Sequence, residues 1–288
     1  MRRILITGKG SYIGTHFKQY MEQWPDKYQV KELDMMDPSW KKHDFSSYDV
    51  IYHVAGLAHS TPDESQRNLY YQVNTDLAYE TAKKAKDASV KQFIFMSSII
   101  VYGSGKVGED RVITKDTPLT PDNFYGDSKK QAEIKLQTLM DDHFKVVILR
   151  PPMIYGPNSK GNYPMLAKLA RKTPLFPNIQ NQRSMLYVGN LVEFVRLMIE
   201  NEEEGIFLPQ NDEYSCTADL VRTIATIHHH KIWFTKLFNP IIKLMKKETH
   251  INKMFGNLII DKNISKYKNI YNIYSLNDAI EFTEVNHE

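Results

Sequence analysis

Tyr125 and Lys129, in the segment Tyr-Gly-Asp-Ser-Lys, are the residues whose types and spacing could do proton chemistry. Residues four apart share one face of a helix, so the phenol and the ammonium would be neighbours there. A free tyrosine has a pKa near ~10, and a nearby cation favours the phenolate. Such a tyrosine can exchange a proton with a carbonyl or alcohol oxygen. The pattern indicates the proton half of a carbonyl–alcohol interconversion, whose hydride half needs a nicotinamide.

A glycine-rich turn near the N-terminus predicts the dinucleotide site that this reaction requires. The apolar segment 3–6 runs into Thr-Gly-Lys-Gly-Ser-Tyr-Ile-Gly at 7–14, and a helical stretch follows at 13–23. Glycine permits a tight turn, and the amides at a helix N-terminus stabilise a pyrophosphate. In this strand–turn–helix context the glycines favour a dinucleotide site over an ordinary turn.

An acidic residue after the second predicted strand, 28–33, indicates which dinucleotide binds. Asp34 follows Gly14 by twenty residues, and a carboxylate there accepts from both ribose hydroxyls and repels a 2′-phosphate. The sequence therefore favours NAD(H). Asp37 could take the same role, and Lys9 in the glycine turn could favour a phosphate, which keeps NADP(H) as the alternative.

Alternating segments place these motifs in a parallel sheet wrapped by helices. Strand-like runs at 3–6, 50–54, 92–97 and 146–149 alternate with helical stretches at 13–23, 64–87, 127–142 and 190–200. Only about fifteen residues follow Asp34 before the next strand, so we expect the usual crossover helix to be shortened or missing. After about residue 150 prolines become frequent, which predicts a second, smaller lobe.

Polar and small residues follow the predicted strands, at the edge where open α/β sheets bind their ligands. Ala55 and Gly56 would let a cofactor pass close to the backbone, and Ser98 would meet a substrate oxygen. His59 would lie at the mouth of the same crevice, although a lone loop histidine is more often solvated.

Composition and charge exclude several classes of protein. The chain has 288 residues with 37 basic and 34 acidic side chains, a balance that does not suit a nucleic-acid binder. A single cysteine, Cys216, excludes a disulfide framework and fits a reducing cytoplasm. The apolar run after Met1-Arg2-Arg3 is too short for a signal peptide, and no run is long enough to span a bilayer. We therefore expect a soluble, cytoplasmic protein.

Taken together and in order, the motifs resemble the extended short-chain dehydrogenase/reductases that act on nucleotide sugars. The resemblance covers roughly residues 1–210 and rests on the glycine turn, Asp34, Ala55-Gly56, Ser-Ser-Ile-Ile-Val-Tyr-Gly at 97–103, Tyr125-x-x-x-Lys129 and Leu-Arg-Pro-Pro-Met-Ile-Tyr-Gly-Pro at 149–157. It implies an α/β fold with a doubly wound parallel sheet of the Rossmann type and a smaller C-terminal substrate-binding lobe. The expected domains are residues 1–152, with a return segment near 184–208, and mainly residues 153–288.

The resemblance also implies roles for individual residues. Ser98 would orient the reacting oxygen, Tyr125 would be the acid/base, and Lys129 would lower the Tyr125 pKa and bind the nicotinamide ribose. Serine stands at position 11 where the family turn has its middle glycine, and a left-handed backbone there would cost it about 1 kcal/mol. The cofactor would contact Gly8, Gly10, Ser11, Tyr12, Ile13, Gly14, Asp34, Asp44, Phe45, Ala55, Gly56, Tyr125, Lys129 and Pro152, with Asp44 and Phe45 near the adenine.

Two aliphatic residues narrow the expected reaction. Sugar 4,6-dehydratases of this family carry an Asp-Glu pair directly after the catalytic hydroxyl residue, where this chain has Ile99-Ile100. Aliphatic side chains cannot transfer protons, which leaves a 4-ketoreductase or a 4-epimerase. The chain resembles in particular the reductases of bacterial capsule and surface-polysaccharide biosynthesis that convert a UDP-linked 4-keto-6-deoxy-N-acetylhexosamine into UDP-N-acetylfucosamine. A dinucleotide sensor without turnover is a further alternative, but such proteins commonly lose the catalytic tyrosine or lysine.

The second lobe would bind the UDP-sugar. Its expected contacts are Lys160, Asn162 and Arg183, together with His59, Ser98 and Tyr102 from the first domain, and Arg183 is the best phosphate ligand because of its planar fork of donors. The basic, apolar stretch 228–254 could lie on an anionic membrane, but Pro240 interrupts it and such a stretch usually faces a core, so membrane contact is not expected. Three consecutive histidines at 228–230 cannot face one ion together, so we assign no metal. By family analogy the helices at 64–87 and 127–142 could form a homodimer.

Overall fold

The computed structural model describes residues 1–58, 63–245 and 248–285. The chain divides into two compact units, each built from separate parts of the sequence. Unit 1 consists of Met1–Gly103, Leu119–Pro151 and Leu191–Pro209, and unit 2 of Ser104–Pro118, Pro152–Asn190 and Gln210–Glu288.

Unit 1 is built on a six-stranded parallel sheet with the strand order β10-β6-β4-β3-β1-β2. The predicted α/β fold with a parallel sheet is confirmed. All four strand-like runs and the second strand at 28–33 lie in this sheet, and a short edge strand from the return segment completes it. The strands are β1 Arg2–Thr7, β2 Tyr28–Leu33, β3 Val50–His53, β4 Gln92–Met96, β6 Lys145–Leu149 and β10 Gly205–Phe207.

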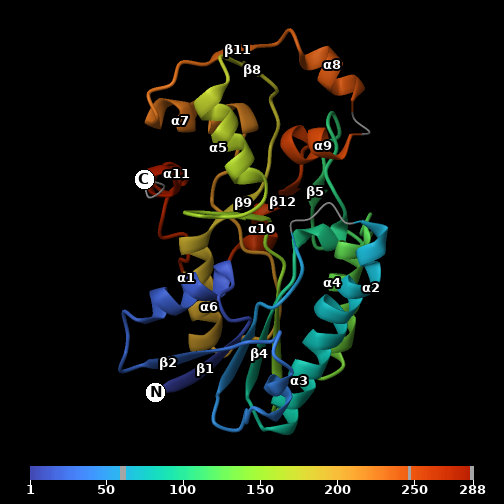
Figure 1. Ribbon diagram of the computed structural model, residues 1–288, viewed down its shortest axis with the longest axis vertical. Coiled ribbons are helices and arrows are strands. Elements are labelled where there is room, and N and C mark those ends of the chain that lie inside the picture. Colours follow the sequence, from blue (N-terminus) through green and yellow to red (C-terminus); the bar gives the residue numbers. More distant parts are fainter. Residues whose placement is uncertain (59–62, 246–247, 286–288) are drawn as a thin grey trace. The chain divides into compact units, whose positions relative to one another are not determined.

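Helices cover both faces of the sheet, as Figure 1 shows. Successive strand side chains point to opposite faces, so Leu5, Ile51 and Phe93 join a core cluster with alanines of α3 and α4. On the other face Tyr52 meets Phe17 of α1 edge to face, at a ring-centroid distance of 5.1 Å. The helices are α1 Tyr12–Met21, α3 Leu77–Asp87, α4 Phe124–Gln137 and α6 Val188–Glu200.

Two connections depart from the usual doubly wound pattern. The short crossover between β2 and β3 holds a single 3₁₀ turn, Pro38–Lys42, which agrees with the predicted loss of a full helix. The helical stretch expected at 64–87 is interrupted: α2 Arg67–Tyr71 is followed by a π-helical turn at Gln72–Asp76 before α3 begins. Such π turns are rare and frequently lie at functional sites.

A buried ion pair joins α4 to the end of β6. Glu133, which is 0% exposed, receives two charge-assisted bonds from Arg150, with Nη2 2.5 Å from Oε2 and Nε 3.1 Å from Oε1. Ser97 donates to the same carboxylate, and Arg150 Nη1 donates to the Tyr102 hydroxyl at 2.6 Å. The buried charges are thus paired and hydrogen-bonded from several elements, which is the condition for tolerating them in a core.

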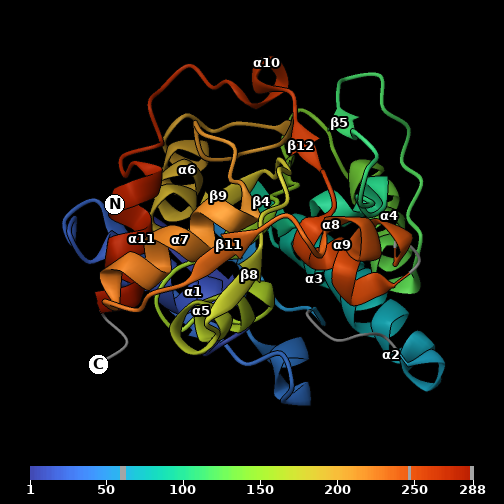
Figure 2. The same ribbon diagram turned by 90° about the horizontal axis from the view of Figure 1, so that it is seen from above.

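Unit 2 consists of helices around three small parallel sheets, each of two strands: β8 with β11, β5 with β12, and β7 with β9. Helix α7 contacts both α5 and α11, and these three helices lie together in Figures 1 and 2. The strands are β5 Val112–Ile113, β7 Met153–Tyr155, β8 Leu175–Pro177, β9 Met185–Tyr187, β11 Trp233–Thr235 and β12 Ile259–Ile260. The helices are α5 Asn162–Lys172, α7 Thr217–Ile227, α8 Asn239–Leu244, α9 Thr249–Phe255, α10 Lys262–Ser265 and α11 Leu276–Val285.

A second buried carboxylate holds α11 in unit 2. Glu284 accepts from the Tyr163 hydroxyl at 2.8 Å, and its other oxygen lies 2.6 Å from His228 Nε2. His230 Nε2 lies 3.1 Å from the Thr173 carbonyl oxygen instead. Two of the three consecutive histidines therefore bond to different partners.

Among the helices of residues 1–58, 63–245 and 248–285, none has both the length and the apolar character that crossing a bilayer requires.

We expect Glu133→Gln to lower the free energy of unfolding by about 3 kcal/mol, because it removes one partner of a buried ion pair and leaves Arg150 buried without its counter-charge. Equilibrium urea unfolding at pH 7 measures this change. Glu80→Gln is the matched control, since Glu80 also lies on a helix but pairs with Lys41 with both side chains more than half exposed; it should change stability by less than about 0.5 kcal/mol. Equal effects of the two substitutions would contradict the assignment.

Candidate active site

The glycine turn after β1 has a backbone that suits its residues. Gly8 and Gly10 have φ of +128° and +71°, a region that favours glycine, whereas Ser11 has φ −67° and ψ 147° and is extended. The Ser11 hydroxyl accepts from the Gly14 amide at 3.2 Å and caps α1, whose first two residues are Tyr12 and Ile13. The strain considered for serine at this position is therefore absent, because the left-handed residue is Gly10.

The turn also fits a dinucleotide by shape. A Cβ on Gly8 would lie 2.9 Å from the Ala55 amide nitrogen, so the turn packs directly against the loop after β3. A Cβ on Gly14 would meet Ile6 at 3.0 Å, whereas one on Gly10 would have no described atom within 4 Å. Close packing on one side and open space at Gly10 leave the N-terminus of α1 accessible to a phosphate group.

The acidic residues at the end of β2 have different partners. Asp34 is exposed directly after β2, and its Oδ1 accepts from the Met36 amide at 2.8 Å. Glu32 accepts from the Gly10 amide at 3.2 Å and from Lys18 Nζ at 2.9 Å, and these bonds, that of Lys18 first, lower its pKa. Glu32 was missed by the sequence analysis, although its position two residues before Asp34 puts it on the same side of the strand.

The residues predicted to lie near the adenine, Asp44 and Phe45, have partners within the protein. The Asp44 carboxylate accepts from the Ser46 amide and hydroxyl, each at 2.8 Å. The Phe45 ring is 1% exposed and belongs to the core cluster beneath the sheet, so its side chain is not presented to a ligand. His59 lies outside the described residues.

Asn74 joins the loop after β3 to helix α4. Its Oδ1 accepts from the Leu57 amide at 2.8 Å, and its Nδ2 donates to the Ser128 hydroxyl at 3.0 Å. A Cβ on Gly56 would lie 3.0 Å from both Asn74 Oδ1 and Lys129 Nζ, so a larger residue there would push against these side chains. Asn74 was not predicted as a site residue. The structure singles it out as a polar side chain that is 0% exposed and lies in a π-helical turn.

Ser98 and Tyr125 are brought together. Ser98 caps the 3₁₀ turn Ile99–Tyr102 that follows β4, and Tyr125 lies in the first turn of α4, whose N-cap is Asn123. Burial raises the pKa of Tyr125 to about 12, and the hydrogen bond with the Ser98 side chain opposes that rise. Loss of water around the phenol therefore has the largest effect on this pKa, and lowering by Lys129 stays a prediction.

Lys129 lies one helical turn after Tyr125 and is buried. Its Nζ donates to the Met96 carbonyl at 2.8 Å and lies 4.7 Å from the centre of the Phe95 ring. Burial lowers its pKa to about 8, against the attraction of Glu133. Nδ1 of the neighbouring His53 forms a hydrogen bond of 2.8 Å with Thr7 Oγ1. Burial together with the Lys129 charge lowers the pKa of His53 to about 3.

Tyr102, a predicted substrate contact, is 4% exposed, and its hydroxyl accepts from Arg150 Nη1 at 2.6 Å. The guanidinium also lies over its ring, with Cζ 5.1 Å from the ring centre. Tyr102 is therefore a support for the Arg150–Glu133 ion pair.

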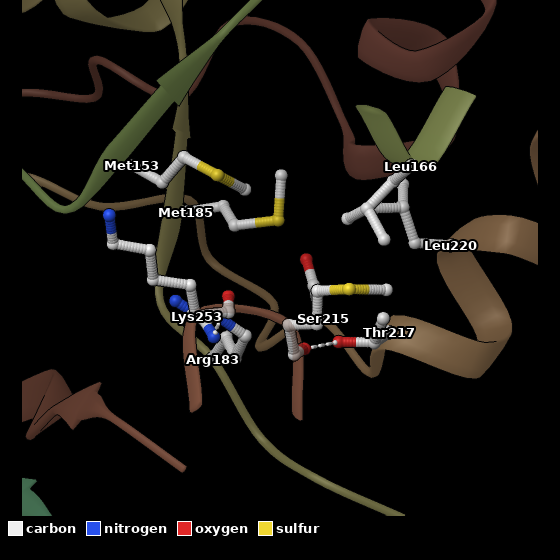
Figure 3. A pocket seen from close by; sticks show the side chains of 9 residues that line it. Met153, Leu166, Arg183, Met185, Ser215, Thr217, Leu220 and Lys253 are labelled. Atoms are coloured by element: carbon white, nitrogen blue, oxygen red, sulfur yellow. Dashed lines mark hydrogen bonds between the residues drawn. The ribbon is translucent and has the colours of Figure 1, made fainter. Parts of the chain in front are cut away.

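In unit 2, Arg183 lines a small cavity of about 10 Å³ together with Met153, Ser215 and Lys253 (Figure 3). Its Nη1 donates to the carbonyl of Lys253 at 2.6 Å and to those of Asn252 and Gly256 at longer range. Burial lowers its pKa to about 10, which still leaves the guanidinium charged at neutral pH. The other predicted residues of unit 2 do not line this cavity: Lys160 is exposed, Asn162 begins α5, and Pro152 is buried at the start of its segment.

The Lys129 pKa predicts a pH effect on stability. The unfolded chain holds a proton on this lysine up to about pH 10.5 and the folded chain only to about pH 8, so burial destabilises the fold at pH 7 and this cost disappears as the pH rises through that window. Between pH 7 and 10 the wild type should gain about 2 kcal/mol relative to Lys129→Met in urea unfolding. Lys135→Met, at an exposed lysine, is the control, and the wild type should gain no stability relative to it. If the wild type gained as much relative to Lys135→Met as relative to Lys129→Met, burial of Lys129 would not be the cause.

Comparison with known proteins identifies the family. The family model described as "NAD dependent epimerase/dehydratase family" matches residues 4–208. The chain is 34% identical over 227 residues to a UDP-glucose 4-epimerase of Vibrio cholerae, which covers 74% of this chain and 68% of the relative. It is 29% identical to an N-acetyl-alpha-D-glucosaminyl-diphospho-ditrans,octacis-undecaprenol 4-epimerase of Escherichia coli O157:H7, over 70% of this chain and 64% of the relative. The chain thus spans about two thirds of the length of these relatives.

Solved structures agree in fold. The UDP-glucuronic acid 4-epimerase from Bacillus cereus in complex with NAD superposes with a TM-score of 0.75 at 18% identity, over 99% of this chain and 96% of that one. RMD from Pseudomonas aeruginosa complexed with NADPH gives 0.74 at 16% identity, over 99% of both chains. The family match, the 34% identity and the shared fold agree: this chain belongs to the NAD dependent epimerase/dehydratase family.

Proposed function

We propose that this protein reduces the 4-keto group of a UDP-linked 6-deoxy-N-acetylhexosamine with NAD(P)H, giving UDP-N-acetylfucosamine for capsule or surface-polysaccharide biosynthesis. The observation that carries the proposal is the cluster in unit 1, where the Ser98 side chain is close enough to the Tyr125 phenol to affect its pKa and Lys129 follows one helical turn later. A hydroxyl pair of this kind can orient a carbonyl oxygen and supply it with a proton.

Tyr125 can act as the proton donor that reduction needs. With a pKa of about 12 the phenol holds its proton at neutral pH. Oxidation of an alcohol, the first step of epimerisation, needs the same residue as a base. The geometry is compatible with both directions.

Dehydration is not supported. Ile99 and Ile100 form the start of the 3₁₀ turn directly after Ser98, and Ile99 is 7% exposed. Neither side chain can remove or donate a proton, so elimination of water has no acid–base pair at these two positions.

The residues of the glycine turn and of the neighbouring strand ends fit the expected cofactor, NAD(H) with NADP(H) as the alternative. When bound, the nicotinamide would supply the hydride. The residues proposed to hold the dinucleotide are the turn at 8–14 for the pyrophosphate, Asp34 for the adenosine ribose, Ala55 and Gly56 along the β3 loop, and Tyr125 and Lys129 for the nicotinamide ribose. Two structural relatives with this fold were solved with NAD and with NADPH, respectively.

In unit 2 we propose Arg183 as the ligand of the UDP diphosphate, with Lys253 as a second cation beside it (Figure 3). The bonds of Arg183 to the three carbonyls use Nη1, and they fix the plane of the guanidinium, whose fork of donors suits phosphate oxygens. Lys160 and Asn162 stay candidates for the same nucleotide.

A UDP-sugar 4-epimerase with tightly bound NAD is the second candidate, and a specific observation favours it. The relatives from Vibrio cholerae and Escherichia coli O157:H7, at 34% and 29% identity, both carry the name of a 4-epimerase. An epimerase must oxidise C4 and reduce it again with the same cofactor, so it needs no external reductant.

One experiment separates the two reactions. The purified protein is mixed with a UDP-4-keto-6-deoxy-N-acetylhexosamine and either NADH or NADPH, and the reduced-nicotinamide absorbance is followed. We expect stoichiometric loss of absorbance and a 6-deoxy sugar product. No loss, together with interconversion of UDP-GlcNAc and UDP-GalNAc without added cofactor, would replace the reductase by the epimerase.

Tyr125→Phe should lower kcat about 10²-fold or more, because it removes the proton donor while keeping the ring. Tyr79→Phe is the matched control, since this tyrosine lies on α3 and packs against the core cluster. It should leave kcat within about twofold. Retention of most activity by Tyr125→Phe would contradict the assigned acid.

Asp34→Ala should move the ratio of kcat/KM for NADH over NADPH toward NADPH by about tenfold, because it removes a carboxylate that repels a 2′-phosphate. Asp37→Ala tests the competing residue. An unchanged ratio in Asp34→Ala and a changed one in Asp37→Ala would transfer the role to Asp37.

A further inference from the structure

The segment from β11 to α8 in unit 2 presents an unusual amount of apolar surface. Trp233 is 78% exposed, Leu237 76%, Ile241 57% and Leu244 84%, and Leu175, the partner of Trp233 in the β8–β11 register, is 42% exposed. Soluble proteins rarely group large exposed apolar side chains in this way. We call these five residues, with the exposed Met245, the α8 patch.

The patch is built on a fixed backbone. Three residues separate the end of β11 from the start of α8, and the Thr235 carbonyl accepts from the Asn178 amide at 2.8 Å. Asn239 Nδ2 donates to the Asn178 carbonyl at 2.9 Å, which ties the start of α8 to the end of β8. Figures 1 and 2 both show the short connection between β11 and α8.

Spacing puts the helical part of the patch on one side. Ile241 and Leu244 are three residues apart in α8 and so share one face, and Leu237 lies in the turn just before the helix. Ile242, which is 7% exposed, points inward and anchors the helix. Pro240 lies in the first turn of α8, where its missing N–H costs nothing, so it begins a helix rather than interrupting one. The stretch 228–254 is expected to face a core, but in the structure five of its large apolar side chains are exposed: Trp233, Leu237, Ile241, Leu244 and Met245.

The charged residues within the segment that carries the α8 patch are all basic. Between Asp219 and Glu248 the sequence contains no acidic residue, and the exposed Lys231, Lys236 and Lys243 lie within the segment that carries the patch. Asp219, at the near end, pairs with Arg222, and Glu248 follows the patch at its far end. Lysines around exposed Trp and Leu are the combination that binds the headgroup region of an anionic bilayer.

We propose that the α8 patch docks unit 2 on an anionic lipid surface, with Trp233, Leu237 and Leu244 entering the interface and the lysines contacting lipid headgroups. This is peripheral binding, and it needs no spanning helix. It departs from the expectation that the protein makes no membrane contact, and it does not depend on which sugar is the substrate.

Flotation of the full-length protein with vesicles of phosphatidylcholine, with or without phosphatidylglycerol, tests the proposal. We expect binding to the anionic vesicles at low salt, weaker binding at high salt because charge is screened, and little binding to pure phosphatidylcholine. Each lysine near such a surface strengthens binding about fivefold, so Lys236→Glu/Lys243→Glu should weaken it at least about 20-fold. Lys266→Glu, an exposed lysine outside the patch, is the control.

Tryptophan fluorescence reports the contact directly. The chain has 3 tryptophans, of which Trp233 is 78% exposed and Trp40 5%. Anionic vesicles should shift the emission to the blue, and Trp233→Phe should abolish the shift while keeping most of the binding. Leu244→Asp should abolish binding, whereas Ile270→Asp, at an 83% exposed position outside the patch, should not.

Three results would overturn the proposal: no binding to anionic vesicles at low salt, equal effects of Leu244→Asp and Ile270→Asp, or a dimer in solution that Leu244→Asp dissociates. The last result would assign the patch to contact between two copies of the chain.

Discussion

The candidate site depends on one buried ion pair, between Glu133 and Arg150. Tyr125, Lys129 and Glu133 follow each other at intervals of four along α4 and therefore share a face. The last of them is held by Arg150 at the end of β6 and by Ser97 at the end of β4. Because the helix is fixed to two strand ends at this point, its first turn presents Tyr125 to Ser98. This buried polar network costs desolvation energy, and it also positions the side chains of the candidate site.

Much of unit 1 could be predicted from the sequence, because each signal was local. The apolar runs at 50–54 and 92–97 are buried strands, and a crossover too short for a helix has none. What failed depended on surroundings that no local pattern contains. Ser11 is extended because Gly10 takes the left-handed position, and Phe45 enters the core because β3 lies beside it. The Tyr125 pKa rises because burial removes water from the phenol, which the spacing of Tyr125 and Lys129 alone does not reveal.

Unit 2 was harder to predict for a different reason. Its strands have two or three residues, too few for a period of alternation to be read. An amphipathic pattern indicates that two faces of a helix differ, but it does not indicate which face packs against the rest of the protein. In α8 the inward position is taken by Ile242, and the wider apolar face is the outer one. Arg183 was singled out by its motif, yet its bonds to three carbonyls could not be foreseen, because Asn252, Lys253 and Gly256 lie about seventy residues away.

Burial shifts the pKa values of Tyr125 and Lys129, the two central groups of the site, in opposite directions. Loss of water raises the pKa of Tyr125 to about 12 and lowers that of Lys129 to about 8, so in both residues the neutral form is favoured. Near neutral pH the phenol keeps its proton firmly, and Lys129 is the group closest to its own titration. A negative charge developing beside Lys129 would stabilise its ammonium, and that ammonium would in turn stabilise the charge. The buried lysine therefore makes the site sensitive to anionic character in a molecule bound beside it.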